Sequence, residues 1–383
     1  MQSTEASVGA RVMQVVDEKV LPRRYIVLAL FGAVFAIVWL DLNNASGGDW
    51  HSFVQAARLF RTTPVDGDVA TPVMLVVAYP FTVLSVSTGW RVASALCVGL
   101  GLLTIRFVEQ AAEVAAFVTR RDRQRAVLFG GMFLMYAWAL PGARWGHLDD
   151  VIAMSCLALA CRALVSGRWL MASFAVAVAI DAKPWVVLAL PLAACCTGAR
   201  VRGLAVAGAA ALVPWIPFAI AQHGHLGSLN LLVAPDSGLH YLGARIGSSP
   251  GWQRQLEVAV ALPLGAYAVV KNKWYLVPAI AFAVRINLDP ATFAYYVTGP
   301  ILGLLIWDVV RPMRVPGLRT VLGCIALALV PSYLLRWNGY GATAPYVAVL
   351  RLAAAVPPIA VLFGLTPTLV RRVWTAPSGG LLE

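Results

Sequence analysis

Charged side chains in this sequence stand at the ends of apolar stretches, where they could carry out chemistry at one face of a membrane. The first is Asp49, which follows the first long apolar segment and precedes an amphipathic run, Trp50 to Phe60. A carboxylate backed by Trp50 and Phe53 is well placed to act as a reaction base. The alternative is that Asp49 only caps an interfacial helix, a position that aspartate favours.

The elements that must hold these residues are membrane helices. Of the 383 residues, 60% are hydrophobic and 13% are charged, a balance that ordinary soluble domains do not reach. The net charge is +12, and the lysines and arginines that produce it lie in short loops between apolar stretches. This is the pattern of residues that orient a protein in a membrane, so we expect no nucleic-acid partner. The six cysteines lie inside apolar segments and read as packing residues. His223 and His225 are interpreted as loop residues instead of metal ligands, and we expect no cofactor; the sequence leaves a divalent metal open without supporting one.

Placing the basic clusters in the cytoplasm predicts an all-α polytopic membrane protein with about twelve spans and both termini inside. The first span, Tyr25–Leu40, is expected to be retained. As a full span, Pro72–Leu84 would put the basic run Arg120–Arg125 outside, so we expect it to be an interfacial or partly inserted helix of the first outer loop. Trp169–Ile180 and Trp274–Val284 are spans shorter than the roughly 20 residues that a bilayer needs. The other predicted spans are Val92–Arg106, Ala126–Leu140, Val151–Val165, Val186–Cys196, Gly203–Ala221, Leu256–Val270, Ala291–Val310, Thr320–Leu335 and Ala344–Leu365.

This topology gathers ionisable residues on the outer face, mostly at span ends. They are Asp49, His51, Arg144, His147, Asp149, Asp150, Asp181, Lys183, His240, Arg245, Arg285 and Asp289. Charges near the hydrocarbon are costly, so such a cluster is a candidate site. A carboxylate facing cations suits the attack of a hydroxyl on a phosphate-activated carbon, because the base takes the proton while the cations neutralise the departing phosphate.

Most of these residues also have a plain structural interpretation. Asp149 and Asp150 could cap the helix that follows them. Lys183 could extend to the interface, and Arg144 could anchor it there beside a tryptophan. Asp181 could pair with Lys183 or cap a helix end.

The sequence has no nucleotide-binding or serine-hydrolase motif of the types GxxxxGK[ST], GxGxxG or GxSxG. It also has no soluble domain able to hold a nucleotide. Any activated donor must therefore be borne by the membrane.

Three motifs resemble those of the C-type (GT-C) membrane glycosyltransferases. They are Asp49 followed by Ala56-Ala57-Arg58, then Gly146-His147-Leu148-Asp149-Asp150 opening a span, then Ala182-Lys183-Pro184-Trp185 before an apolar run that ends in Pro191. The sequence is most similar to actinobacterial mannosyltransferases of glycosyltransferase family 87, which use polyprenyl-phosphate sugars. The likeness covers residues 25–200 of a single domain, 1–383. Residues 201–383 look like the variable C-terminal helices of such enzymes.

The resemblance implies an inverting glycosyltransferase of the bacterial plasma membrane with an extracytoplasmic active site. It implies transfer of mannose or arabinose from a polyprenyl phosphate to a lipid- or polysaccharide-linked acceptor, with Asp49 as general base. The lysine and outer-loop acids of the family map to Lys183 and to Asp149 or Asp150. We assign donor-phosphate binding to Lys183, Arg144 and Arg245, and substrate binding to His51, His147, Asp149, Asp150, His240, Tyr241 and Asp289.

Two other classes stay open, a polyprenol-phosphate or glycolipid transporter and a non-catalytic scaffold with the same fold. A flippase would need charges along a route through the bilayer and paired repeats of discontinuous helices. The expected charges instead gather at one face, which favours the enzyme.

Overall fold

The computed structural model describes residues 12–42, 49–60, 71–221, 231–248 and 250–365. Every regular element in these ranges is a helix, in agreement with the all-α prediction. The predicted cytoplasmic termini, the loop histidines His223 and His225, and the part of the first loop between residues 61 and 70 lie outside the described residues.

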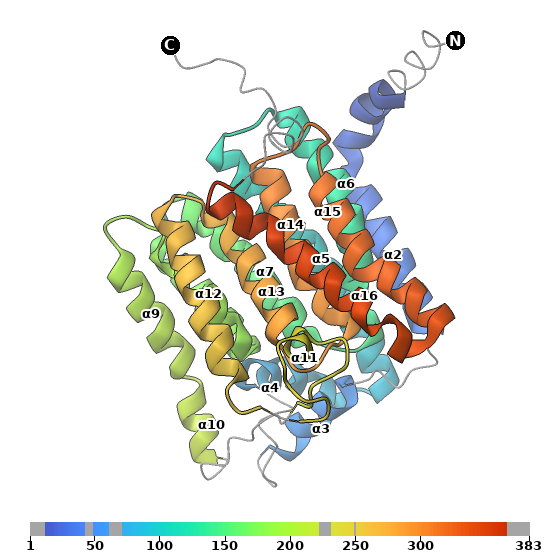
Figure 1. Cartoon of the computed structure of the whole chain (residues 1–383), viewed down its shortest axis with the longest axis vertical. Helices are drawn as coiled ribbons and strands as arrows, with labels where there is room; N and C mark the ends of the chain where they lie inside the picture. The colour runs from blue at the N-terminus through green and yellow to red at the C-terminus, as the bar shows by residue number, and fades with distance from the viewer. Residues whose placement is uncertain (1–11, 43–48, 61–70, 222–230, 249, 366–383) are drawn as a thin grey trace.

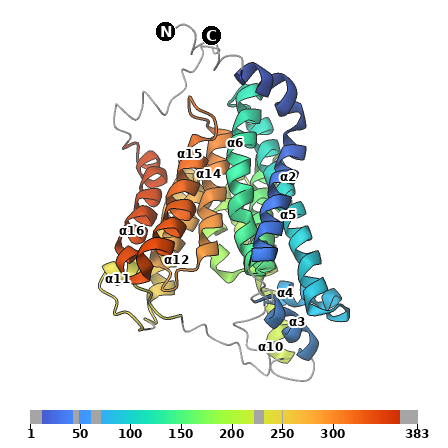
Figure 2. The ribbon, with the colours of Figure 1, turned by 90° about the vertical axis from the view of Figure 1, so that its right-hand side faces the viewer.

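Long helices run side by side between two ends of the molecule (Figure 1). They are α2 (Arg24–Leu42), α5 (Val86–Ala115), α6 (Arg120–Ala139), α7 (Leu148–Val165), α8 (Trp169–Ala182), α9 (Arg200–Leu212), α12 (Gln253–Val270), α13 (Val277–Leu288), α14 (Thr298–Val310) and α16 (Val330–Leu362). The short helix α15 (Leu318–Cys324) continues through the π-helix η8 (Ile325–Leu329) into α16. The 3-10 helix η5 (Pro184–Ala194) lies among them. Short helices gather at one end: α3 (Trp50–Leu59), α4 (Pro72–Ala78), α10 (Trp215–Ala221) and α11 (Gly238–Tyr241) (Figures 1 and 2). We call this the α3 end.

Five helical segments in the described residues are long and apolar enough to cross a membrane. They are Val12–Leu40, Val86–Ala115, Arg120–Arg144, Arg200–Ile220 and Ala342–Leu362. Shorter apolar helices of 10–17 residues, such as Trp169–Ala182 and Trp274–Leu288, lie between them in the sequence. The prediction of a helical membrane protein is therefore confirmed, and the figure of about twelve spans stays a prediction.

The ambiguous segment Pro72–Leu84 forms α4 and the 3-10 helix η3 (Tyr79–Val83), which pack against α3. Both lie at the α3 end instead of crossing the bundle, as expected for a helix of the first outer loop (Figure 2). Thr71 begins α4, because its hydroxyl accepts the backbone N–H of Met74.

Three predicted spans, Gly203–Ala221, Thr320–Leu335 and Ala344–Leu365, match apolar helical segments of the structure, which differs from the prediction only in where the turns fall. The expected loop between Thr320–Leu335 and Ala344–Leu365 is helical, because the backbone of α16 stays helical from Val330 to Leu362. The expected span Gly203–Ala221 is interrupted at Val213 and Pro214, which separate α9 from α10, since a proline removes a helix hydrogen bond.

Small residues allow the central helices to pack closely. Helix α7, which packs between α5 and α8, buries alanines such as Ala153, Ala158 and Ala160. Gly303 of α14 faces the backbone of α13, where a methyl group on Gly303 would come within 2.6 Å of the Ala279 Cα atom. This close approach fixes α13 against α14.

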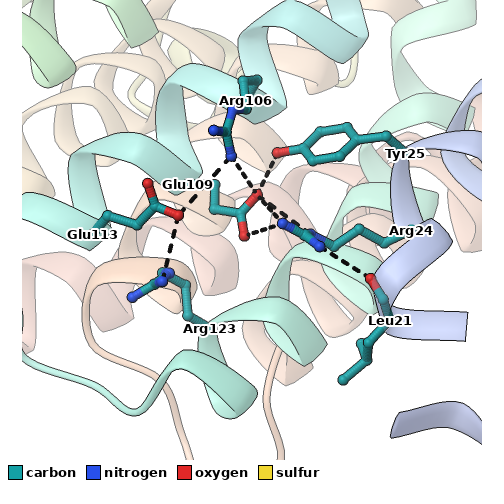
Figure 3. Close-up of polar contacts among 7 residues, drawn as sticks. All are labelled: Leu21, Arg24, Tyr25, Arg106, Glu109, Glu113 and Arg123. Atoms are coloured by element: carbon teal, nitrogen blue, oxygen red, sulfur yellow. Dashed lines mark hydrogen bonds and ion pairs between the residues drawn. The ribbon is translucent and has the colours of Figure 1, made fainter. Parts of the chain in front are cut away.

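An ion-pair cluster joins α2, α5 and α6 at the end opposite α3 (Figure 3). The fully buried carboxylate of Glu109 lies 2.8 Å from Arg24 Nη2 and accepts a hydrogen bond from the Tyr25 hydroxyl. Nearby, Glu113 lies 3.4 Å from Arg123 Nη2. These contacts fix the start of the first long helix against its neighbours.

Candidate functional site

Asp49 begins α3, but its side chain does not cap that helix. The residue occupies the N-cap position without a side-chain capping hydrogen bond. Its backbone N–H donates to the carbonyl of Trp145 at 3.1 Å, which ties the start of α3 to the loop before α7. The Asp49 Oδ2 atom lies 2.7 Å from Nε2 of His147. The interpretation of Asp49 as a plain helix cap is therefore wrong, because its carboxylate is committed to an ion pair.

The local sequence explains how His147 reaches Asp49. A π-helical turn, η4 (Leu140–Arg144), ends α6, and Gly146 follows with φ of +72°, a conformation that glycine adopts without strain. The backbone N–H of His147 then donates to the carbonyl of Pro141 at 2.8 Å. His147 thus stands as the N-cap residue of α7 with its imidazole buried under α3.

A chain of alternating charges continues from His147 into the bundle. His147 Nδ1 lies 3.3 Å from Asp149 Oδ1 and 3.7 Å from Asp150 Oδ2. The Lys183 ammonium lies 2.6 Å from Asp149 Oδ2 and 3.3 Å from Asp150 Oδ2. Both carboxylates are buried in the first turn of α7, where the helix dipole favours negative charge. We call Asp49, His147, Asp149, Asp150 and Lys183 the outer charge chain, after the face on which the sequence predicts them to lie.

Lys183 belongs to this chain because of the break between α8 and η5. It follows the last turn of α8 in an extended conformation, and Pro184 opens the next helix. Its side chain is 18% exposed and points to the two aspartates, so it does not extend to the interface. Asp181 neither pairs with Lys183 nor caps a helix. It is buried, and its Oδ1 atom has no hydrogen-bond partner among the described residues.

The electrostatics of the chain keep Asp49 ionised. Contact with His147 lowers the pKa of Asp49, although partial burial opposes this. Burial and Lys183 lower the pKa of His147, but the carboxylates of Asp149 and Asp49 outweigh them and raise it to about 9. Burial also lowers the pKa of Lys183, while Asp149 and Asp150 raise it above its ordinary value. At neutral pH the chain therefore holds an aspartate base next to an imidazolium.

Asp49 is the member of the chain that is open to a substrate. Its side chain is 57% exposed, whereas those of His147, Asp149 and Asp150 are all below 10%. His147 Nε2 is close to Asp49 but makes no well-directed hydrogen bond in the described structure. The Asp49 carboxylate is therefore held in place by its attraction to the imidazolium, and its oxygens keep lone pairs that can accept a proton.

Aromatic side chains cover the buried side of the histidine. The Tyr295 ring lies 4.2 Å from the His147 ring, centroid to centroid, and Phe53 of α3 meets the same imidazole edge-on at 5.9 Å. Tyr296 packs against Tyr295 at 4.9 Å. These rings exclude water from the imidazole, which strengthens its attraction to Asp49.

Sequence reasoning missed the two tyrosines. They belong to the 3-10 helix η7 (Ala294–Val297), which precedes α14. The signal was present, because Phe293-Ala294-Tyr295-Tyr296 stands at the outer end of a predicted span, beside Asp289. Without the fold, nothing distinguishes these aromatic residues from ordinary interfacial anchors.

The remaining predicted residues of the loops near α3 and α6 lie apart from the outer charge chain. Arg144 packs its guanidinium 4.5 Å above the ring of Trp39 and 5.5 Å from that of Trp145, in the manner of an interfacial anchor. His51 is exposed on α3. No contact among the described residues joins either side chain to the chain.

The residues predicted in the later outer loops form a separate region. His240 places Nδ1 3.3 Å from the carbonyl of Ala244, and Tyr241 is exposed. Arg245 follows in the same turn, where its carbonyl accepts the N–H of Ser248. Asp289 is buried beside two arginines outside the outer charge chain.

One group of ligand atoms in the chain could hold a metal ion. His147, Asp149 and Asp150 each offer an atom, and these atoms lie within 4.8 Å of one another. The same carboxylates contact the Lys183 ammonium, which supplies positive charge at that position. A divalent ion would have to displace or repel the lysine.

Comparison of the sequence with protein-family models and with curated proteins gives no match. The outer charge chain therefore has to be interpreted from its own chemistry.

Proposed function

We propose that the protein is a multi-pass glycosyltransferase that uses a polyprenyl-phosphate sugar, of the mannose or arabinose type, as donor. The acceptor is a hydroxyl of a lipid- or polysaccharide-linked glycan. The proposal extends the resemblance in the three sequence motifs, whose key residues Asp49, His147, Asp149 and Lys183 lie in one connected group of charges.

The observation that carries this proposal is the exposed, ionised carboxylate of Asp49 held beside a buried imidazolium. A carboxylate with free lone pairs at the edge of a buried charge network can accept a proton from a bound hydroxyl. His147 already carries its proton at neutral pH, so its role is to orient and stabilise Asp49.

The reaction balances with these groups. The acceptor oxygen attacks the anomeric carbon of the donor, and its proton passes to Asp49. A carbon–oxygen bond to the acceptor forms while the bond to the phosphate oxygen breaks, and polyprenyl phosphate leaves with the bonding electrons. Attack from the face opposite the phosphate inverts the anomeric centre. Phosphate is a good leaving group, so the site needs no general acid.

We place the α3 end on the extracytoplasmic side. The ion pairs of Arg24, Arg106 and Arg123 lie at the opposite end, and Lys273 donates to the carbonyls of residues 361 and 362, where α16 ends. Basic residues near span ends favour the cytoplasm. In this orientation the donor is presented from the outer leaflet of a bacterial plasma membrane.

The variant Asp49→Asn tests the proposal. Purified protein in proteoliposomes is given a radiolabelled polyprenyl-phosphate sugar and a total extract of actinobacterial envelope glycolipids as acceptor, and labelled product is counted. Loss of a general base should reduce transfer by about 100-fold or more. The matched control is Asp122→Asn, because Asp122 is a partly exposed carboxylate in the first turn of α6, next to Arg123 of the opposite end.

Transfer by D49N at a rate near that of the unchanged protein would remove the assignment of Asp49. Movement of the intact labelled lipid across the bilayer, without cleavage of the sugar–phosphate bond, would instead identify a transporter.

A further inference from the structure

Arg285 is a buried cation next to the outer charge chain, and the proton-transfer chemistry of Asp49 does not use it. It lies in the last turn of α13 and is 5% exposed. Its guanidinium carbon lies 4.2 Å from the ring centroid of Trp185 and 4.3 Å from that of Tyr296. Both rings fix the plane of the guanidinium by packing against it.

The charge of Arg285 is only partly compensated. The nearest carboxylate oxygen, Asp289 Oδ2, lies 3.7 Å from its Nη2 atom. The same oxygen lies 3.2 Å from Nη1 of Arg254, which also pairs with Glu257 at 3.0 Å. Asp289 is therefore shared, and Arg254 lies closer to it.

One donor of Arg285 has no hydrogen-bond partner in the described part of the chain. Its Nη1 atom is buried and makes no hydrogen bond to any residue that the structure describes. Burying a charged donor without a partner costs free energy, typically more than a neutral group costs. A guanidinium held by two aromatic rings with a donor to spare has the geometry of a site for an oxyanion, above all a phosphate.

Arg285 is connected to the outer charge chain through Tyr296. The Tyr296 ring contacts Arg285 and packs against Tyr295, whose ring lies against that of His147. Trp185, on the other face of Arg285, follows Lys183 by two residues. Arg285 is thus linked to His147 through the packed rings of Tyr296 and Tyr295.

The other cations near the site are already engaged. The Lys183 ammonium contacts Asp149 and Asp150 at 2.6 and 3.3 Å, and Arg144 packs on the Trp39 ring. Arg254 lies close to the carboxylates of Glu257 and Asp289. Of the four cations Lys183, Arg144, Arg254 and Arg285, it is Arg285 that is buried, held between two aromatic rings and left with a donor that has no hydrogen-bond partner among the described residues.

We propose that Arg285 binds the phosphate of the lipid donor, with Trp185 and Tyr296 holding its guanidinium in place. This proposal rests on the proposed function, since it names the phosphate ligand of that same site. The sequence analysis assigned donor-phosphate binding to Arg144 and Arg245 and gave Arg285 no role; the present proposal assigns donor-phosphate binding to Arg285 instead. Arg285 stabilises the negative charge that develops on the phosphate as the sugar leaves.

The test is a binding measurement on the purified, detergent-solubilised protein without any sugar transfer. Polyprenyl monophosphate is the probe, and its affinity is followed by native mass spectrometry or microscale thermophoresis. Arg285→Gln removes the charge but leaves Asp289 paired with Arg254, so the fold should persist. Loss of a charge-assisted hydrogen bond predicts about 10- to 100-fold weaker binding.

Two further variants make the result specific. Arg285→Lys keeps the charge without the planar fork, and we expect intermediate affinity. Arg162→Gln is the matched control, because Arg162 also packs on an aromatic ring, that of Phe107, but lies in the last turn of α7, away from the α3 end. We expect R162Q to bind the probe as the unchanged protein does.

Each outcome decides between the proposals. Equal affinity of R285Q and the unchanged protein overturns the role of Arg285 and leaves the proposed function intact. Failure of the unchanged protein to bind polyprenyl monophosphate overturns both. Displacement of the probe by inorganic phosphate at equal concentration would identify a site for free phosphate, and displacement by phosphatidylglycerol dissolved in the same detergent would identify a general headgroup site. Either result would overturn the assignment to the donor.

Discussion

Replacing Lys183 by methionine removes the ammonium that faces two buried carboxylates. Asp149 and Asp150 are 3% and 5% exposed, and Lys183 lies 2.6 and 3.3 Å from them. Methionine preserves most of the apolar stem, so the change isolates the charge. Removing one partner of a buried ion pair costs about 3–5 kcal/mol, because the other charge is left without compensation. We expect the free energy of unfolding of K183M to fall by that order.

The pH dependence of this loss has a definite sign. The pKa of Lys183 is raised in the folded protein, so its contribution is fully present below the unfolded pKa of about 10.4 and constant between pH 5 and 8. Without the lysine, one of the two carboxylates should hold a proton in the folded state. The folded protein then binds more protons than the unfolded chain, so the stability of K183M should rise as the pH falls from 8 to 5.

A thiol-reactive fluorescent dye provides the assay, because Cys97, Cys161 and Cys324 are buried and react only when the protein unfolds. The double variant K183M/D150N should recover part of the loss, since Asp149 is then the single buried carboxylate that Lys183 no longer compensates. The control is Lys271→Met, an exposed lysine over the Tyr267 ring. If K183M and K271M melt at the same temperature and with the same pH dependence, the ion-pair chain is not a stabilising structure.

Two other substitutions test the site and the packing beneath it. His147→Gln should let the pKa of Asp49 rise toward its ordinary value, so the acid limb of a kcat/KM profile for sugar transfer should move to higher pH. The decline near pH 9, which follows deprotonation of His147, should disappear. A pH profile identical to that of the unchanged protein would contradict the pairing of His147 with Asp49. Gly303→Ala places a methyl group within 2.6 Å of the Ala279 Cα atom and should lower the free energy of unfolding by about 1–3 kcal/mol. The control is Gly208→Ala, whose methyl group meets no neighbouring atom within 4 Å and which should be neutral or stabilising in the same melting assay.

The sequence was sufficient to predict which residues could share the α3 end. Composition implies membrane helices, and the sidedness of basic clusters brings Asp49, Asp149 and Lys183 to one face. Their pairing was not predictable, because His147 meets a carboxylate 98 positions earlier in the chain only through the packing of α3 on the loop before α7. The histidine therefore appeared as a substrate ligand, whereas it lies between two aspartates.

The other differences between prediction and structure also come from packing between segments far apart in the sequence or from the local backbone. Residues 337–342 have the Gly-rich composition of a loop, yet the backbone of α16 continues through them. Arg144 has the position of a phosphate ligand in sequence, but the ring of Trp39 from α2 holds it. Arg285 was recognised only as an outer-face charge, since its unpartnered donor depends on how Trp185 and Tyr296 enclose it.

The most direct measurement is an electron cryo-microscopy map of the D49N variant in nanodiscs with a polyprenyl-phosphate sugar. We expect density for the sugar beside residue 49, with the phosphate on Arg285 and the lipid tail leaving the bundle at the α3 end. Lipid-phosphate density on the Arg24, Arg106 and Arg123 cluster at the opposite end, with none near residue 49, would contradict this expectation.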